Sequence, residues 1–174
     1  MKKIISIFLV ILMIIGIVVM PTKSYASFSI ESADLYSKGI YSDYLHYGDI
    51  GIVFNYVVYS KDGVEYPSYS LNKDLDGVTG SYTYSVSTDE LLSDVRVWRT
   101  IINGYPYKSA AELGCATNEE AFIATKQAVY CMLYGRRPEE YNANDEREQR
   151  VLNALTQIVT NANNSTQIKQ SSNL

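Results

Sequence analysis

Few residues in this chain could act as nucleophiles, bases or metal ligands in a known arrangement. His46 is the only histidine, and Cys115 and Cys131 are the only cysteines. Their spacing is not that of a zinc site, and no flanking signature indicates a Cys–His catalytic pair. The sequence also lacks a glycine-rich phosphate loop and a Gly-x-Ser-x-Gly turn. We therefore expect no metal and no small-molecule cofactor.

The two cysteines leave two interpretations open. A disulfide between Cys115 and Cys131 is permitted in an exported protein. A chain of 174 residues can nevertheless bury enough surface for a core without such a bridge. Two free thiols packed as small hydrophobic side chains is the more economical interpretation.

Three segments carry a more specific pattern. The first is residues 65–78, which contain Tyr-Ser-Leu with its serine at Ser70. The second is residues 98–106, which end in Gly-Tyr-Pro, and the third is residues 119–130, which contain Ala-Thr-Lys-Gln-Ala-Val-Tyr. In this order, over residues 48–162, the chain resembles the thioester domains of Gram-positive surface adhesins, the family often called TQxA.

The resemblance implies an unusual chemistry. In that family, a Tyr-Cys-Leu strand segment supplies a cysteine and an Ala-Thr-Gln-x-Ala helix supplies a glutamine. The two side chains condense into an internal thioester with loss of ammonia. The thioester then acylates a nucleophile, such as a lysine amine, that proximity and desolvation favour. Such a domain reacts once and stays attached, so the resemblance implies a covalent anchor to a host surface protein and not an enzyme.

This chain departs from the family at both ends of that bond. Ser70 occupies the position of the family cysteine. The family glutamine is matched by Lys126 in the register that aligns Thr-Gln-x-Ala, or by Gln127 after a slip of one residue. Such a slip turns the side chain by about 100° around the helix. The candidate site residues are therefore Ser70, Lys126 and Gln127, and no thioester can form among them.

Three functions remain open for this degenerate site. The domain could bind a partner non-covalently through its surface, which sixteen tyrosines make rich in rigid amphipathic contact area. A covalent bond from Ser70 would be an ester, which is a weaker electrophile than a thioester. A small secreted hydrolase would pair Ser70 with Lys126 as the base, if burial depresses the lysine pKa. The simpler interpretation of Lys126 is that its aliphatic stem is buried and its ammonium reaches the surface.

The N-terminus has the composition of a signal peptide. Lys2 and Lys3 precede an apolar run over residues 4–20, and Ser24-Tyr25-Ala26 offers small residues to a signal peptidase. We predict a signal peptide over residues 1–26 and a secreted or cell-surface protein. An uncleaved membrane anchor is the alternative, because the apolar run lies at the low end of a membrane span.

The charge of the chain indicates which partners are suitable. Fifteen Lys and Arg residues against nineteen Asp and Glu give a net charge of −4, and the body of the sequence has no basic run. A nucleic-acid partner is therefore not expected. By resemblance, the partner is a host surface or extracellular matrix protein, and we expect a monomer.

The spacing of apolar residues, which predicts the elements that position the site, changes near residue 87. Before it, apolar residues alternate, which predicts a strand over residues 50–59, a turn at 61–63 and a further strand over 82–86. The return arm, residues 64–71, contains Pro67 and is predicted to be an edge strand or a broken one.

After residue 87, apolar residues recur with the period of a helix. Capping boxes at residues 87–90 and 117–120 start two helices, the first ending at Gly104 and Pro106 and the second at Gly135. A third helix is predicted over residues 145–162. The side chains expected to face inward are Leu91, Val95, Trp98 and Ile102 in the first helix and Val151, Ala154, Leu155 and Ile158 in the third.

Strands followed by helices predict an α+β fold. We expect one domain over residues 27–162, with an N-terminal antiparallel sheet lobe followed by a helical lobe. Ser70 and the helix over residues 119–134 should meet at the interface of the two lobes. Residues 163–174 are predicted to be a disordered polar tail.

Overall fold

The computed structural model describes residues 31–61, 63–74, 77–78, 80–86 and 94–167. These residues belong to one compact unit, residues 30–172, and a second unit of residues 1–29 and 173–174 lies outside the described part. The predicted signal peptide is therefore outside it too. Within the described part, no helix has both the length and the apolar composition of a membrane span.

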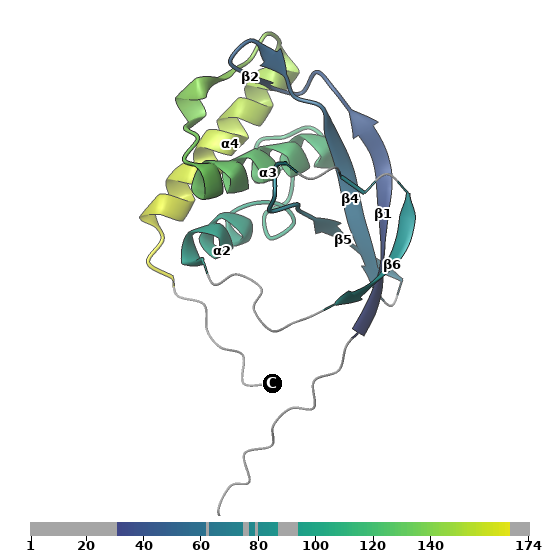
Figure 1. The fold of residues 1–174 in the computed structure, drawn as a ribbon. Coiled ribbons are helices and arrows are strands. Elements are labelled where there is room, and N and C mark those ends of the chain that lie inside the picture. Colours follow the sequence, from purple (N-terminus) through teal and green to yellow (C-terminus); the bar gives the residue numbers. More distant parts are fainter. Residues whose placement is uncertain (1–30, 62, 75–76, 79, 87–93, 168–174) are drawn as a thin grey trace, which may run out of the picture. The chain divides into compact units, whose positions relative to one another are not determined.

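The N-terminal half is an antiparallel sheet of four strands in the order β5-β4-β1-β6 (Figure 1). The sequence patterns assigned no strand to its inner member β1, in which a register shift between Ser37 and Gly39 interrupts the pairing with β4. Because β1 pairs with β4 and β6, it holds the sheet together. The strands are β1 (Glu31–Tyr41), β4 (Phe54–Lys61), β5 (Val64–Ser68) and β6 (Ser81–Val86).

The β4–β5 hairpin agrees with its prediction. Lys61 pairs with Val64 across a turn in which Gly63 has a φ of 78°, a conformation that glycine adopts without strain. β5 is an edge strand, as Pro67 requires, because proline cannot donate a hydrogen bond to a second neighbour.

The predicted strand over residues 50–59 is wrong in its first part. Only residues from Phe54 onward enter the large sheet, and Ile50 is 73% exposed. The alternating pattern therefore continues across two separate elements. Ile50–Gly51 forms β3 of a small sheet in the order β3-β2-β7, with β2 at His46–Tyr47 and β7 at Tyr141–Asn142.

The two longer helices begin and end close to where their capping residues predict. The Thr117 side chain accepts a hydrogen bond from the backbone of Glu120, and Gly135 ends the same helix with a φ of 69°. Asp145 caps the last helix, which continues past its predicted end, so residues 163–164 are helical and not part of a disordered tail. The helices are α2 (Val95–Ile102), α3 (Asn118–Tyr134) and α4 (Glu146–Asn164), with a short 3-10 helix η1 (Pro138–Glu140).

The predicted inward face of the first helix is wrong. In α2 the buried residues are Val97 and Thr100, whereas Val95 is 36% exposed and Trp98 only partly buried. The reason is that α2 packs Val97 against α3, a contact that the local pattern does not specify. Asp94 caps α2, and the predicted capping box at residues 87–90, like Leu91, lies outside the described residues.

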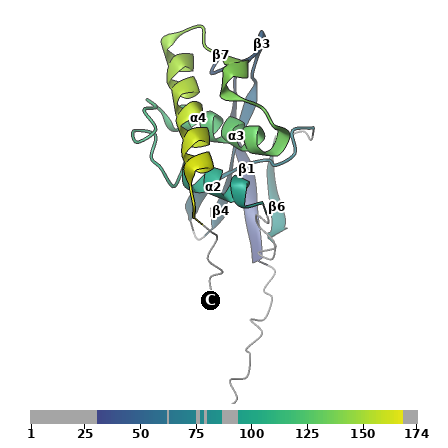
Figure 2. The same ribbon diagram turned by 90° about the vertical axis from the view of Figure 1, so that its left-hand side faces the viewer.

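α3 is the central helix of the fold. It contacts α2, α4 and β4, and Figure 2 shows α4 and α2 beside it in the helical half. Phe122 packs its ring against Tyr56 of the sheet, with ring centroids 4.4 Å apart. The predicted inward residues of α4 are fully buried, and the α+β fold is confirmed. These α4 residues are Val151, Ala154, Leu155 and Ile158.

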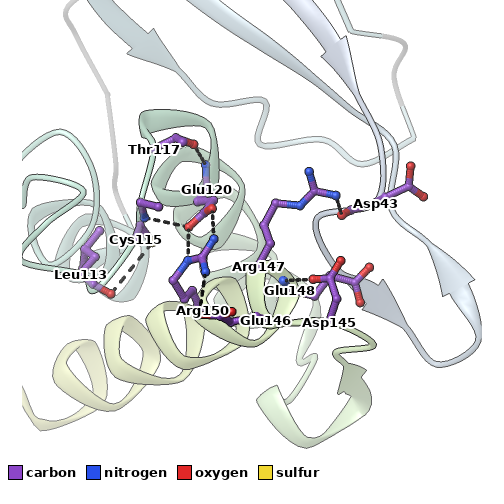
Figure 3. A network of polar contacts seen from close by, with 11 residues as sticks. Asp43, Leu113, Cys115, Thr117, Glu120, Asp145, Glu146, Arg147, Glu148 and Arg150 are labelled. Atoms are coloured by element: carbon purple, nitrogen blue, oxygen red, sulfur yellow. Dashed lines mark hydrogen bonds and ion pairs between the residues drawn. The ribbon is translucent and has the colours of Figure 1, made fainter.

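An ion pair between a buried glutamate and a partly exposed arginine joins α3 to α4 (Figure 3). Glu120 Oε1 lies 2.7 Å from Nη2 of Arg150, and Glu120 Oε2 accepts a hydrogen bond of 2.8 Å from the backbone of Ala116. Burial acts to raise the pKa of Glu120, but the hydrogen bonds from Arg150 and Ala116 outweigh it and hold this pKa below its ordinary value. The start of α3 is therefore fixed in place.

Candidate functional site

Ser70 follows the edge strand β5, and contacts to both its neighbours fix its position. The Tyr69 ring stacks on Phe122 of α3 at 4.8 Å between centroids, and its hydroxyl donates to the carbonyl of Tyr105 at 2.6 Å. On the other side, the Tyr134 hydroxyl donates to the carbonyl of Leu71 at 2.8 Å. The segment is thereby attached to two points of α3, as the predicted interface requires.

The Ser70 hydroxyl itself is exposed and engaged with nearby backbone. It donates to the carbonyl of Asn72 at 2.8 Å, and the Asn72 amide lies 3.3 Å from the same oxygen. Burial raises the pKa of Tyr130 on α3, and the nearby Ser70 hydroxyl opposes this shift. Ser70 therefore lies close to the face of α3 that bears Tyr130.

Lys126 interrupts the buried surface of α3. Every other residue from Glu120 to Cys131 is buried, whereas Lys126 is partly exposed. Burial of its side chain lowers the pKa of Lys126. Within the described part of the chain, the Lys126 ammonium has no hydrogen bond or ion pair.

Gln127 has a different environment from its neighbour. Its side chain is 3% exposed, and its Oε1 accepts hydrogen bonds from the Tyr141 hydroxyl at 3.1 Å and from Nη1 of Arg136 at 3.2 Å. These bonds hold the carboxamide against β7 and the segment after α3. Gln127 therefore has a structural role in addition to any that it has in the site.

One cavity brings the three predicted residues together. Ser70, Lys126 and Gln127 all line a hollow of about 780 Å³ between the sheet and α3. Ser70 and α3 are far apart in the sequence, so no local pattern predicts that they lie together. Only the family resemblance predicted this site. The cavity is also lined by residues that the sequence analysis did not select, among them Ile40, Ile50, Val53, Lys73, Asp74, Tyr130 and Arg136.

The Gly-Tyr-Pro segment was predicted only to end a helix, but it also contacts α3 through Thr125. The Thr125 hydroxyl of α3 accepts a hydrogen bond from the Tyr105 amide at 2.9 Å and donates to Ala121 O at 2.8 Å. An added Cβ at Gly104 would lie 2.5 Å from Cγ2 of Thr125, so only glycine fits there. Thr125 thus holds the segment beside Tyr69 and, through it, positions Ser70.

Neither cysteine contributes to this cavity. Cys115 and Cys131 are free and buried, which confirms the interpretation as packed thiols. Burial raises the pKa of Cys115 to about 12 and that of Cys131 to about 11. Neither thiol lines the cavity among its described residues.

His46 makes a contact that is independent of the cavity. Its Nδ1 lies 3.2 Å from Oε2 of Glu148, which is buried on α4. The described residues contain no group of histidine, cysteine and acidic side chains that could hold a metal ion. His46 therefore packs in the fold and is paired with neither cysteine.

The fold and this cavity define a class of protein. A sheet whose edge strand leads into a Tyr-x-Leu segment, packed over a central helix with a Thr-x-x-Ala motif, is the arrangement expected for a thioester domain. The family model for the thioester domain matches residues 67–164, more than half of the chain. The chain belongs to the thioester domain family.

Solved structures share this fold. The Bacillus anthracis TIE protein is similar with a TM-score of 0.63 and 24% identity, over 80% of this chain and 25% of that chain. The thioester domain of the Enterococcus faecium TIE86 protein is similar with a TM-score of 0.58 and 21% identity, over 79% of this chain and 52% of that chain. The chain thus spans between a quarter and about half of these structures. No curated protein sequence matches it.

Proposed function

We propose that this chain is an exported adhesion module of the thioester domain family that binds a host surface or extracellular matrix protein without a covalent bond. The observation that supports this proposal is the composition of the cavity. Ser70 and the two candidates for the family glutamine, Lys126 and Gln127, all line it, and no described cysteine does. The partner surface is then held by ordinary contacts, and the module is not an enzyme.

The chemistry of the pair excludes the family bond. A thioester needs a thiol and an acyl carbon, and Ser70 with Lys126 provides a hydroxyl and an amine. Neither group contains a carbonyl carbon for the other to attack. Gln127 has one, but the Ser70 hydroxyl donates to Asn72 O, and a neutral serine hydroxyl is a poor nucleophile. We use the register that places Lys126 at the family position, because it keeps Thr125 and Ala128 aligned with the family motif, and Gln127 is the alternative.

A serine hydrolase is the second candidate, because a lysine with a lowered pKa lines the same cavity as a serine. The Ser70 hydroxyl nevertheless donates to Asn72 O and makes no hydrogen bond to Lys126. We expect an aryl fluorophosphonate probe to leave Ser70 unlabelled. Labelling of Ser70 that Lys126→Met abolishes would favour the hydrolase instead.

The proposal is tested by the stability of the complex toward denaturant. The purified protein is incubated with immobilised extracellular matrix and with host cells, and the bound fraction is then treated with hot SDS. We expect retention in buffer and complete release in SDS, with Ser70→Ala retained to the same degree. A conjugate that survives SDS and requires Ser70 would contradict the non-covalent proposal.

A further inference from the structure

The described lining of the cavity at Ser70 has an excess of positive charge. Its described lining contains Lys73, Lys126 and Arg136 but only one acid, Asp74. That acid is already paired, because Asp74 Oδ1 lies 2.5 Å from Nζ of Lys73. The chain as a whole has a net charge of −4, so the described lining of the cavity is opposite in sign to the chain.

Two of these cations have no acidic partner among the described residues. Lys126 has no hydrogen bond or ion pair there. Arg136 donates to Gln127 Oε1 and lies over the rings of Tyr47 and Tyr130, at 4.3 and 5.7 Å from their centroids. These contacts of Arg136, and its hydrogen bond with the Tyr141 hydroxyl, are all to neutral groups. A partly desolvated cation without a counter-ion is unfavourable, and an incoming anion relieves that penalty.

The same cavity has an apolar border. Ile40, Ile50 and Val53 contribute to its lining, and their side chains are 67%, 73% and 66% exposed. Three large aliphatic side chains that stay exposed beside one cavity are typical of a surface that a partner covers. A small free acid would neutralise the cations but would leave these side chains in water.

We propose that the cavity binds an acidic side chain of the partner protein, with aliphatic side chains that flank this acid in the partner packed on Ile40, Ile50 and Val53. This inference depends on the proposed non-covalent function and names the chemistry of the partner. It reverses the polarity of the family reaction, in which the target group is a lysine amine. In this chain, Lys126 and Arg136 repel an ammonium and attract a carboxylate.

The test uses peptides that differ in one group. The whole exported chain, labelled with 15N, is titrated with acetyl-Ile-Glu-Ile-amide, with its Gln counterpart of the same shape, and with its Lys counterpart. We expect the Glu peptide to shift the amide resonances of Ser70, Lys126 and Arg136. The Gln peptide should bind about tenfold more weakly, and the Lys peptide should not bind.

Variants distinguish the effect of a charge in the cavity from the effect of the net charge of the chain. Lys126→Met and Lys126→Gln, the second of which places the family residue at this position, should both weaken binding of the Glu peptide about tenfold. Lys108→Met removes the same charge from an exposed pair with Glu112 that does not line the cavity, so it should leave binding unchanged. Native-like spectra of the free variants show that each one is folded.

Each unfavourable result has a distinct meaning. Equal binding of the Glu and Gln peptides, preference for the Lys peptide, no shift with any peptide at millimolar concentration, or full binding by both Lys126 variants would overturn the acidic-partner inference. These results leave the non-covalent function intact, whereas a conjugate of the native protein that survives SDS would overturn that function.

Discussion

Lys126 on the central helix α3 and Ser70 after the edge strand β5 line the same cavity. The resemblance to the thioester domain family places the cysteine of the internal bond at Ser70 and its glutamine at Lys126, with Gln127 as the alternative match. We propose that the site keeps its placement in the fold and has a changed chemistry. In that proposal, a hydroxyl and a cation take the place of the electrophile, and they can bind a partner but cannot acylate one.

Lys126→Met is expected to stabilise the fold. Burial lowers the pKa of Lys126, so the folded state disfavours its charged form. Methionine keeps a similar length without the charge, and we expect a gain of about 1 kcal/mol in the free energy of unfolding at pH 7. The gain should shrink as the pH rises toward the ordinary lysine pKa of about 10.4, because the wild-type lysine then deprotonates in the folded state. Urea unfolding at both pH values measures it, and a destabilised variant would contradict the account.

Gly104→Ala is expected to destabilise the site. The new methyl group would lie 2.5 Å from Cγ2 and 2.7 Å from Oγ1 of Thr125, whose position is fixed by its bonds to Tyr105 and Ala121. We expect a loss of about 2–3 kcal/mol, measured by thermal unfolding. Gly51→Ala is the control, because its nearest atom is 3.4 Å away. Equal effects of the two substitutions would contradict the close contact.

Glu120→Gln is expected to destabilise the chain by about 2 kcal/mol at pH 7, because Arg150 loses its buried partner. The pKa of Glu120 is lowered in the fold, so the stabilisation is present above the ordinary carboxyl pKa of about 4.3 and is lost as the pH falls through the lower folded value. Wild type and variant should therefore converge in acid. Glu146→Gln is the control, since Glu146 is 93% exposed and lies 3.6 Å from the same arginine. A difference that persists in acid would refute the ion-pair explanation.

The thiols of Cys115 and Cys131 are expected to be inert in the native protein. Both are buried, and their pKa values of about 12 and about 11 leave very little thiolate at pH 8. A thiol reagent such as Ellman's should label neither in buffer and both in urea. Rapid labelling of the native protein, or a mass lower by two hydrogens, would show an accessible thiol or a disulfide.

The parts of the fold that the sequence predicts are those specified by local chemistry. Thr117, Gly135 and Asp145 set the ends of α3 and the start of α4 through hydrogen bonds and backbone conformations within one helical turn. β1 was missed because its place depends on pairing with two distant strands. The inward face of α2 was misassigned because packing against α3, and not the pattern of α2 itself, selects Val97.

The site was predictable to a similar degree. Ser70, Lys126 and Gln127 were found through motifs whose order resembles a family, and the structure brings all three to one cavity. Arg136 and the apolar border of the cavity gave no signal in the sequence. They reach the cavity from three separate segments, so only the tertiary structure relates them to Ser70.

This chain has the thioester domain fold, and we propose that it lacks the reactive pair. The most direct test is the intact mass of the purified domain, with and without methylamine, for the native chain, Ser70→Cys, and the double variant Ser70→Cys with Lys126→Gln. We predict that the double variant alone loses one ammonia and then regains the mass of one methylamine. Loss of ammonia by the single variant Ser70→Cys, which still has Lys126, would identify Gln127 as the acyl donor. Incorporation of methylamine by the native chain, or no change in any variant, would contradict the claim.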